Sequence, residues 1–307
     1  MRDNSMKKKF CIGISLEMEI IEYEKLIEQF SPYISTFYFS PPLGDRYHTR
    51  TKIAEQFHNP QLISHFYNII NLVRDKGFKL DCVLNRPTMS LEEVQTALKY
   101  LKYYMEVDQI TCLQEQVELV REQFPDKEII YSYNNDLTIE KIEKISKLFD
   151  TIVVGKYFLR SPLLLKKIYE QGFEIKLLVN NGCSYNCGGC KSGSLQCDET
   201  VIRNLEKENI NYLYALQSFY PYELHNLLEC VDISIKSIKI SNRTSGYQYL
   251  KNCLQSYVEN KDVDNYVIND YHNYRLWCRL GELSHHFKEL NSDEINKYKR
   301  KINVFYM

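Results

Sequence analysis

The stretch Lys79-Leu-Asp-Cys-Val-Leu84 is followed, after a short polar loop, by Ser90-Leu-Glu-Glu93 and an amphipathic segment that reaches Tyr104. The first part is a short apolar run bounded by polar residues, which predicts a buried strand. Ser90 and Glu93 have the spacing of a capping box, so a helix is predicted from residue 90. This strand–loop–helix unit recurs along the chain and decides the fold.

Eight such units can be traced. The predicted strands cover residues 10–15, 36–40, 79–84, 107–112, 128–133, 151–155, 174–179 and 235–240. The clearest predicted helices cover residues 17–30, 60–76, 90–104, 114–124, 138–148 and 161–171. Eight strands, each followed by a helix, favour a TIM-like (β/α)8 barrel over a doubly wound sheet, which needs fewer strands.

The barrel domain is expected to span residues 1–257. An insertion is predicted after the seventh strand, and it contains a further strand candidate at residues 211–217. Residues 258–307 are polar and are expected to form a helical C-terminal extension.

The overall charge gives no net field that favours nucleic acid or an anionic membrane, because 39 basic residues balance 40 acidic ones, and a locally basic cleft stays open. The longest apolar runs fall short of the roughly 18 residues that indicate a membrane-spanning helix, so no membrane partner is expected. The N-terminal segment does not resemble a secretory signal, and we therefore expect a cytoplasmic protein.

Four of the ten cysteines lie within one short segment that directly follows the seventh predicted strand: Cys183, Cys187, Cys190 and Cys197. Clustered thiols in a reducing compartment indicate a metal or catalytic site more often than disulfides. Thiolates are soft ligands that select zinc or iron–sulfur centres. These four residues are therefore the predicted metal ligands.

The four cysteines are compatible with two kinds of metal centre. A structural zinc site with four cysteine ligands has suitable chemistry, but it has no particular reason to lie at the catalytic rim of a barrel. A 4Fe–4S cluster suits the position better. The first three cysteines also match the CxxxCxxC pattern of radical S-adenosylmethionine enzymes, although that motif normally follows the first barrel strand and has an aromatic residue where this chain has Gly189.

Two motifs lie at the last two predicted strands: Val179-Asn-Asn-Gly-Cys183 and Ser237-Ile-Lys-Ile-Ser-Asn-Arg243. Together they resemble the collagenase-like peptidase family, which has a Lys-Ile-Glu-Gly-Arg strand at the second position. Lys239, Ile240 and Arg243 match, whereas Ser241 and Asn242 replace the family's Glu and Gly.

The resemblance implies a TIM-like barrel in which four cysteines hold an iron–sulfur cluster. It also implies oxygen-independent hydroxylation, which the better understood family members perform on ubiquinone precursors or on pyrimidines in RNA. The family's ligands are spread over a longer segment, so Cys230 is an alternative fourth ligand. The loss of the Glu at Ser241 puts a shared acid–base role there in doubt.

Cationic groups follow several predicted strands, at the end where barrels bind their substrates. The candidate substrate-binding residues are Arg243, Lys239, Arg46, His48 and Arg86. They would orient a polar or anionic substrate. Lys239 would be either a site group or a polar plug of the barrel, and a salt bridge or solvated loop is the alternative for each of the others.

The leading hypothesis is an iron–sulfur-dependent oxidoreductase or hydroxylase-like enzyme acting on a small molecule, nucleotide or peptide, together with a protein partner or electron donor. A radical S-adenosylmethionine enzyme and a metal-stabilised, non-catalytic binding partner of a modifying enzyme are the alternatives. No Ser-His-Asp or Cys-His pattern supports a serine or cysteine peptidase, and no catalytic residue is predicted.

Overall fold

Eight parallel strands form a closed barrel in the order β1 to β8. This computed structural model describes residues 8–47, 55–132, 139–155, 162–180, 221–230, 233–241 and 246–261. The strands are β1 Phe10–Gly13, β2 Ile34–Phe39, β3 Lys79–Leu84, β4 Gln109–Cys112, β5 Glu128–Tyr131, β6 Thr151–Val154, β7 Glu174–Leu178 and β8 Ile235–Ile240. Pairing of β1 with β8 closes the barrel, with Cys11 beside Lys239.

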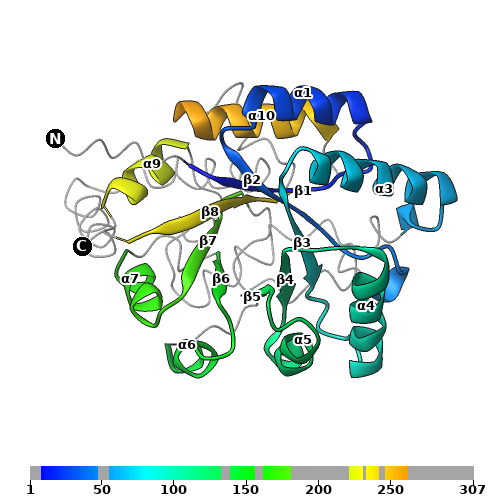
Figure 1. Ribbon diagram of the computed structural model, residues 1–307. Coiled ribbons are helices and arrows are strands. Elements are labelled where there is room, and N and C mark those ends of the chain that lie inside the picture. Colours follow the sequence, from blue (N-terminus) through cyan, green and yellow to red (C-terminus); the bar gives the residue numbers. More distant parts are fainter. Residues whose placement is uncertain are drawn as a thin grey trace, which may run out of the picture. The chain divides into compact units, whose positions relative to one another are not determined.

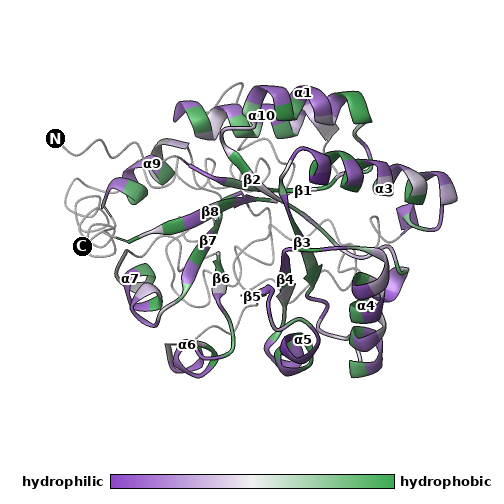
Figure 2. Ribbon diagram, in the orientation of Figure 1, coloured by the Kyte–Doolittle hydropathy of each residue, from purple (hydrophilic) through white to green (hydrophobic). Residues whose placement is uncertain are grey.

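The helices that follow β1 to β5 lie outside these strands (Figure 1). The described helices are α1 Ile20–Phe30, α3 Pro60–Asp75, α4 Leu91–Tyr104, α5 Val117–Gln123, α6 Ile139–Ile145, α7 Pro162–Glu170, α9 Pro221–Cys230 and α10 Gly246–Glu259. Two 3-10 turns, η1 Asp45–Tyr47 and η2 Gln114–Gln116, precede α3 and α5. Hydrophobic and hydrophilic residues alternate around α1, α3 and α4, as in helices that cover a core on one side only (Figure 2).

The eight predicted strands and the barrel are confirmed, with boundary shifts of a few residues. The predicted helix 114–124 is divided into η2 and α5, because the Gln116 side chain accepts a hydrogen bond from the Leu113 backbone at 3.0 Å and tightens the first turn. The predicted capping box is present at the start of α4: Ser90 and Glu93 each bind the other's backbone N–H. Gly77 and Gly172, just beyond α3 and α7, have positive φ angles of 78° and 89°.

The chain divides by contacts into two compact units. The first comprises Met1–Val153, Glu170–Leu177 and Ser234–Lys251, and the second comprises Val154–Tyr169, Leu178–Ile233 and Asn252–Met307. Helix α10 extends past residue 257, the expected end of the barrel domain. The strand candidate 211–217 and all but the first residues of the expected C-terminal extension lie outside the described residues.

The first unit contains a charged pair in the barrel interior. The ammonium of Lys176 on β7 lies 3.3 Å from a carboxylate oxygen of Asp81 on β3, and both side chains are almost fully buried. Because β3 and β7 lie on opposite sides of the closed barrel, this contact crosses the interior. Burial is the largest single effect on Lys176 and disfavours its charged form. Asp81, Cys11 and Glu128 together outweigh it and raise the pKa of the ammonium above its usual value.

Hydrogen bonds complete this interior network. Thr111 donates to the other Asp81 oxygen at 2.7 Å, and Lys176 donates to Gln109 at 2.8 Å. The Gln109 amide then donates to Glu128 at 2.8 Å. Thr151 also donates to Glu128, and the Lys236 ammonium lies 2.7 Å from it. These groups stand near the first residues of their strands, so the network occupies the N-terminal half of the barrel. In this half of a TIM barrel polar residues serve stability rather than catalysis.

The described core of the second unit includes the end of β7 and the last turns of α10. Tyr257 is fully buried and its hydroxyl donates to the Val179 carbonyl at 3.4 Å. Leu224, Leu227 and Leu228 form the buried side of α9, while His225 and Glu229 pair on its outer side at 3.3 Å. His225 therefore lies on a solvent-facing helix surface.

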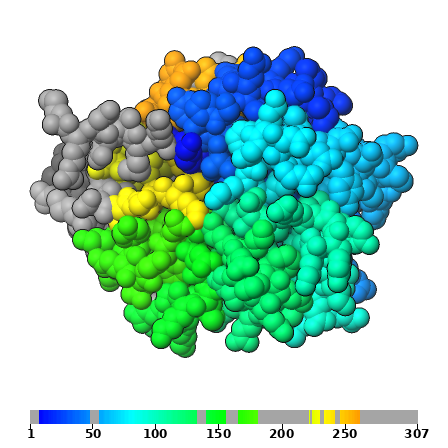
Figure 3. Space-filling view, viewed as in Figure 1, coloured from blue at the N-terminus to red at the C-terminus, as the bar shows by residue number. Residues whose placement is uncertain are grey.

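Within the described residues, no helix is long and apolar enough to cross a membrane. In the space-filling view, the N-terminal part of the chain, coloured blue to cyan, covers adjoining areas of the visible face (Figure 3).

The buried pair leads to a prediction about stability. Lys176→Met leaves the Asp81 carboxylate buried without its cation, and we expect it to lower the free energy of unfolding by about 3–5 kcal/mol. The double variant Asp81→Leu/Lys176→Met removes both charges and should recover most of this loss. Urea unfolding monitored by circular dichroism measures both changes.

Lys79→Met is the matched control, because Lys79 is an exposed lysine on β3 itself. Its effect should stay within about 0.5 kcal/mol. If Lys176→Met were no more destabilising than this control, the interior pair would not be a determinant of stability.

Candidate functional site

The C-terminal ends of the strands carry short polar side chains. Along a strand every second residue faces the same side, so the interior positions continue past the strand ends to Ser40 after β2, Asn85 after β3, Ser132 after β5 and Ser241 after β8. The Asn85 amide donates to the Ser132 hydroxyl at 2.9 Å. Since β4 lies between these two strands, this bond confirms that both side chains turn toward the barrel interior.

Lys239 on β8 is a second lysine inside the barrel. Its side chain is nearly buried, and its ammonium lies 4.2 Å from the centroid of the Tyr38 ring on β2. The Tyr38 hydroxyl donates to the Ile240 carbonyl at 2.9 Å, which holds the ring in place. Strand β1 separates β8 from β2, so Lys239 and Tyr38 approach each other across the inner face of β1. The structure thus places Lys239 in the interior, as both of its predicted roles require.

Arg86 and Arg46 both contact neighbouring protein groups at the rim. Arg86 donates to the Asp45 carbonyl and to the Thr88 hydroxyl, and so fastens the loop after β2 to the loop after β3. Arg46 pairs with Glu93 at 3.1 Å, and its side chain is 81% exposed. The Glu93 pKa is lowered by its hydrogen bond from the Ser90 backbone and by Arg46. These contacts position the loop, and a substrate role for either arginine remains a prediction.

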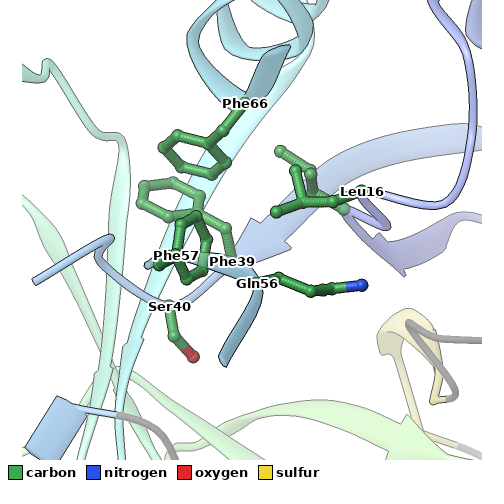
Figure 4. Close-up of a pocket in the computed structure, with 7 residues that line it drawn as sticks. Leu16, Phe39, Ser40, Gln56, Phe57 and Phe66 are labelled. Carbon is green, nitrogen blue, oxygen red and sulfur yellow. The ribbon is translucent and has the colours of Figure 1, made fainter. Parts of the chain in front are cut away.

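A small hollow lies at the ends of β1 and β2 (Figure 4). Its lining residues are Ile14, Leu16, Phe39, Ser40, Gln56, Phe57 and Phe66. The Phe66 ring packs edge-on against the rings of Phe39 and Phe57, with ring centroids 5.5 and 5.4 Å apart. The Ser40 hydroxyl points away from these rings. The free volume is about 10 Å³, roughly the space needed by one water molecule. The hollow is a packing gap at the rim and is too small for a substrate.

The predicted cysteine ligands Cys183, Cys187, Cys190 and Cys197 lie outside the described residues, as do His48 and Arg243. Cys230 is the last residue of α9, and its side chain also lies outside what the structure describes. Among the residues whose placement is described, no group of three His, Cys, Asp or Glu side chains could hold a metal ion. The structure does describe the approach to the cysteine segment: β7 ends at Leu178, and Val179 and Asn180 are buried.

Four dispersed cysteines behave as core residues. Cys11, Cys82, Cys112 and Cys253 are all buried free thiols. Burial raises the pKa of the first three, although the Lys176 and Lys239 ammoniums partly oppose this effect at Cys11. Buried free cysteines of this kind act as small hydrophobic residues.

Sequence reasoning did not single out Asp81, Lys176 or Tyr38. A signal for the first two was present, because each is a charged residue inside an otherwise apolar strand. Such residues are rarely buried without a partner of opposite charge. Tyr38 carried no comparable signal, because an aromatic residue in a strand is ordinary core material.

Comparison with known proteins shows similarity at the level of architecture only. No family model and no curated protein matches the chain. Among solved structures, a mutant tryptophan synthase α-subunit from Pyrococcus furiosus is 10% identical with a TM-score of 0.49, over 82% of this chain and 98% of that chain. The DAHP synthase of Thermotoga maritima is 8% identical with a TM-score of 0.45, over 82% of this chain and 68% of that one. Sequence identities and TM-scores this low do not indicate a function.

The burial of the dispersed cysteines can be tested by alkylation. In the folded protein, Cys11, Cys82 and Cys112 should stay unmodified by iodoacetamide at neutral pH, because burial excludes the reagent and the raised pKa suppresses the thiolate. Peptide mass spectrometry after a timed reaction measures this, and the denatured protein supplies full labelling as the control. Rapid labelling of these three residues in the folded state would contradict their burial.

Proposed function

We propose that this chain is an enzyme that carries a 4Fe–4S cluster on the segment after β7 and modifies a polar small molecule, nucleotide or peptide. One observation supports this proposal above the others. The strand that leads to the four clustered cysteines is a strand of a closed parallel barrel, and the cysteines follow its C-terminal end. In TIM barrels the loops at that end carry the chemistry.

The chemistry of the donor set fits the group. Cys183, Cys187, Cys190 and Cys197 would hold the cluster, with Cys230 as the alternative fourth ligand. A bound cluster would supply one-electron transfer or substrate activation, which suits an oxidoreductase or hydroxylase-like reaction. The resemblance of the Val179–Cys183 and Ser237–Arg243 segments to the collagenase-like peptidase family supports the same proposal.

The chain's own residues would bind and orient the substrate. Lys239 presents a cation within the barrel, and Arg86 holds the rim loop on which Arg46 and His48 stand. Asn85 and Ser132 offer hydrogen-bonding groups at the strand ends. Arg243 would act from the loop after β8.

The first test is metal analysis after purification without oxygen. We expect a brown protein with about four iron atoms and four sulfides per chain, and an iron–sulfur absorption spectrum. Joint substitution of Cys183, Cys187, Cys190 and Cys197 by Ala should abolish both the colour and the iron. Cys112→Ala is the control and should keep the full iron content, because Cys112 is a buried thiol of β4.

The single variants Cys197→Ala and Cys230→Ala then identify the fourth ligand, since only the ligand's loss should lower the iron content. A colourless protein containing zinc would overturn the cluster. Reduction in the presence of S-adenosylmethionine tests the alternative of a radical S-adenosylmethionine enzyme, because only such an enzyme would release deoxyadenosine. If the chain is instead a non-catalytic partner of a modifying enzyme, Arg243→Ala and Arg46→Ala should leave the activity of that enzyme intact. The enzyme proposal predicts that both variants lose activity.

A further inference from the structure

The hollow at the ends of β1 and β2 has the size and the lining of a site for one methyl group. Its free volume of about 10 Å³ corresponds to a single water molecule, and a methyl group is of comparable size. Five of its seven described lining residues are apolar and buried: Ile14, Leu16, Phe39, Phe57 and Phe66. A whole substrate is too large for this space, but one terminal group of a substrate would fill it.

This lining is poorly suited to a water molecule. A buried water molecule makes about three hydrogen bonds to protein groups, whereas apolar cavities stay dry and bind apolar molecules. Among the described lining residues, only Ser40 and Gln56 have polar side chains, and the Ser40 hydroxyl points away from the phenylalanine rings (Figure 4). An apolar group therefore suits the hollow better than water does.

The wall opposite the phenylalanine rings is formed by Leu16 and is fixed by hydrogen bonds on both sides of that residue (Figure 4). The Ser15 backbone N–H donates to the Tyr23 hydroxyl at 2.7 Å, and this hydroxyl donates to the Ser15 carbonyl at 2.9 Å. The Met18 carbonyl accepts a hydrogen bond from the His65 ring of α3 at 2.8 Å. The hollow is therefore preformed, and a ligand does not have to order its walls on binding.

Gln56 adds a hydrogen-bonding group at the edge of the hollow. Its side chain runs along the side between the phenylalanine rings and Leu16 (Figure 4). Within the part of the chain that the structure describes, the Gln56 amide has no hydrogen-bond partner, and the residue is partly exposed. A carboxamide can both donate and accept hydrogen bonds. It can therefore bind a carbonyl or an N–H group that is attached to the methyl group of a ligand.

The segment that carries Gln56 is held at the rim of the barrel. His58 pairs with Asp45 at 2.7 Å, which joins the two ends of the connection between β2 and α3. Arg86 donates to the Asp45 carbonyl and fastens the same connection to the loop after β3. The hollow thus lies at the C-terminal ends of the strands, where TIM barrels bind their substrates.

We propose that this hollow binds the methyl group of a substrate in which the methyl is bonded to a carbonyl carbon or an amide nitrogen, as in an acetyl or N-methylamide group. The methyl group enters between the phenylalanine rings and Leu16, and Gln56 hydrogen-bonds the adjacent polar atom. The proposal rests on the proposed function for describing the ligand as a substrate, whereas binding of the methyl group does not require the cluster.

Formamide, acetamide and propionamide test the hollow, because they share one amide and differ only in the carbon atoms attached to it. In protein labelled with ¹³C at the Ile and Leu methyl groups, the signals of Ile14 and Leu16 report binding at the hollow itself. We expect acetamide to bind about fourfold more tightly than formamide, as one buried methyl group provides. Propionamide should bind more weakly than acetamide, because its additional carbon exceeds the hollow.

Two variants change the hollow in different ways. Phe57→Leu enlarges it and should shift the preference from acetamide to propionamide, a change that loss of folding cannot produce. Gln56→Ala should weaken the binding of all three amides by a similar factor, because it removes their shared hydrogen bond. Phe149→Leu is the matched control: its ring packs against Tyr131 of β5, and the variant should keep the preference for acetamide.

Equal affinities for the three amides would contradict the proposal and indicate that the hollow holds only water. A preference for acetamide that persists in Phe57→Leu would show that the methyl group binds elsewhere. Should Phe57→Leu fail to fold, Leu16→Ala takes its place, because it enlarges the hollow from the opposite wall and leaves Ile14 as the reporter.

The same series on the variant that lacks the four clustered cysteines separates this proposal from that of the cluster. The preference for acetamide should persist in that variant although no iron is bound. Its loss there would contradict a methyl site that is independent of the cluster.

Discussion

The ion pair between Asp81 and Lys176 is the contact on which the barrel interior depends. A buried carboxylate and a buried ammonium are each costly in a dry core, so each requires the other and requires hydrogen bonds for its remaining atoms. Thr111 and Gln109 meet that requirement from β4. Because the partners stand on β3, β4 and β7, a shift of any of these strands by one residue would turn a charged group or one of its hydrogen-bond partners out of the interior.

This constraint divides the barrel along its axis. In the N-terminal half, the carboxylates and cations satisfy one another and hold the strands together. Farther along the strands, Tyr38 packs with Cys11 and Val83, Asn85 donates to Ser132, and Arg86 anchors the rim loop. The two halves therefore differ: the first is held by opposite charges that bind one another, and the second by apolar contacts and by hydrogen bonds between short polar side chains.

Much of the fold could be predicted because its signals are local. The capping box of Ser90 and Glu93, the glycines after α3 and α7, and the apolar strands act within a few residues of one another. The interior network could not be predicted, since partners such as Asp81 and Lys176 are 95 residues apart in sequence and meet only when the barrel closes. At the rim, the sequence indicated cations at strand ends but not their contacts. Arg46 binds Glu93 in the first turn of α4, and Arg86 binds the Asp45 carbonyl in η1. Only the three-dimensional arrangement brings these groups close.

The hydrogen bond from Tyr257 to the Val179 carbonyl connects the last turns of α10 with the end of β7. The carbonyl that it binds belongs to the residue four positions before Cys183. Residues near the end of the described chain thus secure the strand from which the cysteine segment departs. A shortened version of the protein that ends before Tyr257 would keep every described strand and every clustered cysteine, yet it would lose the hydrogen bond at the base of that segment. The end of β7 is therefore held by α10 as well as by its own strand pairing.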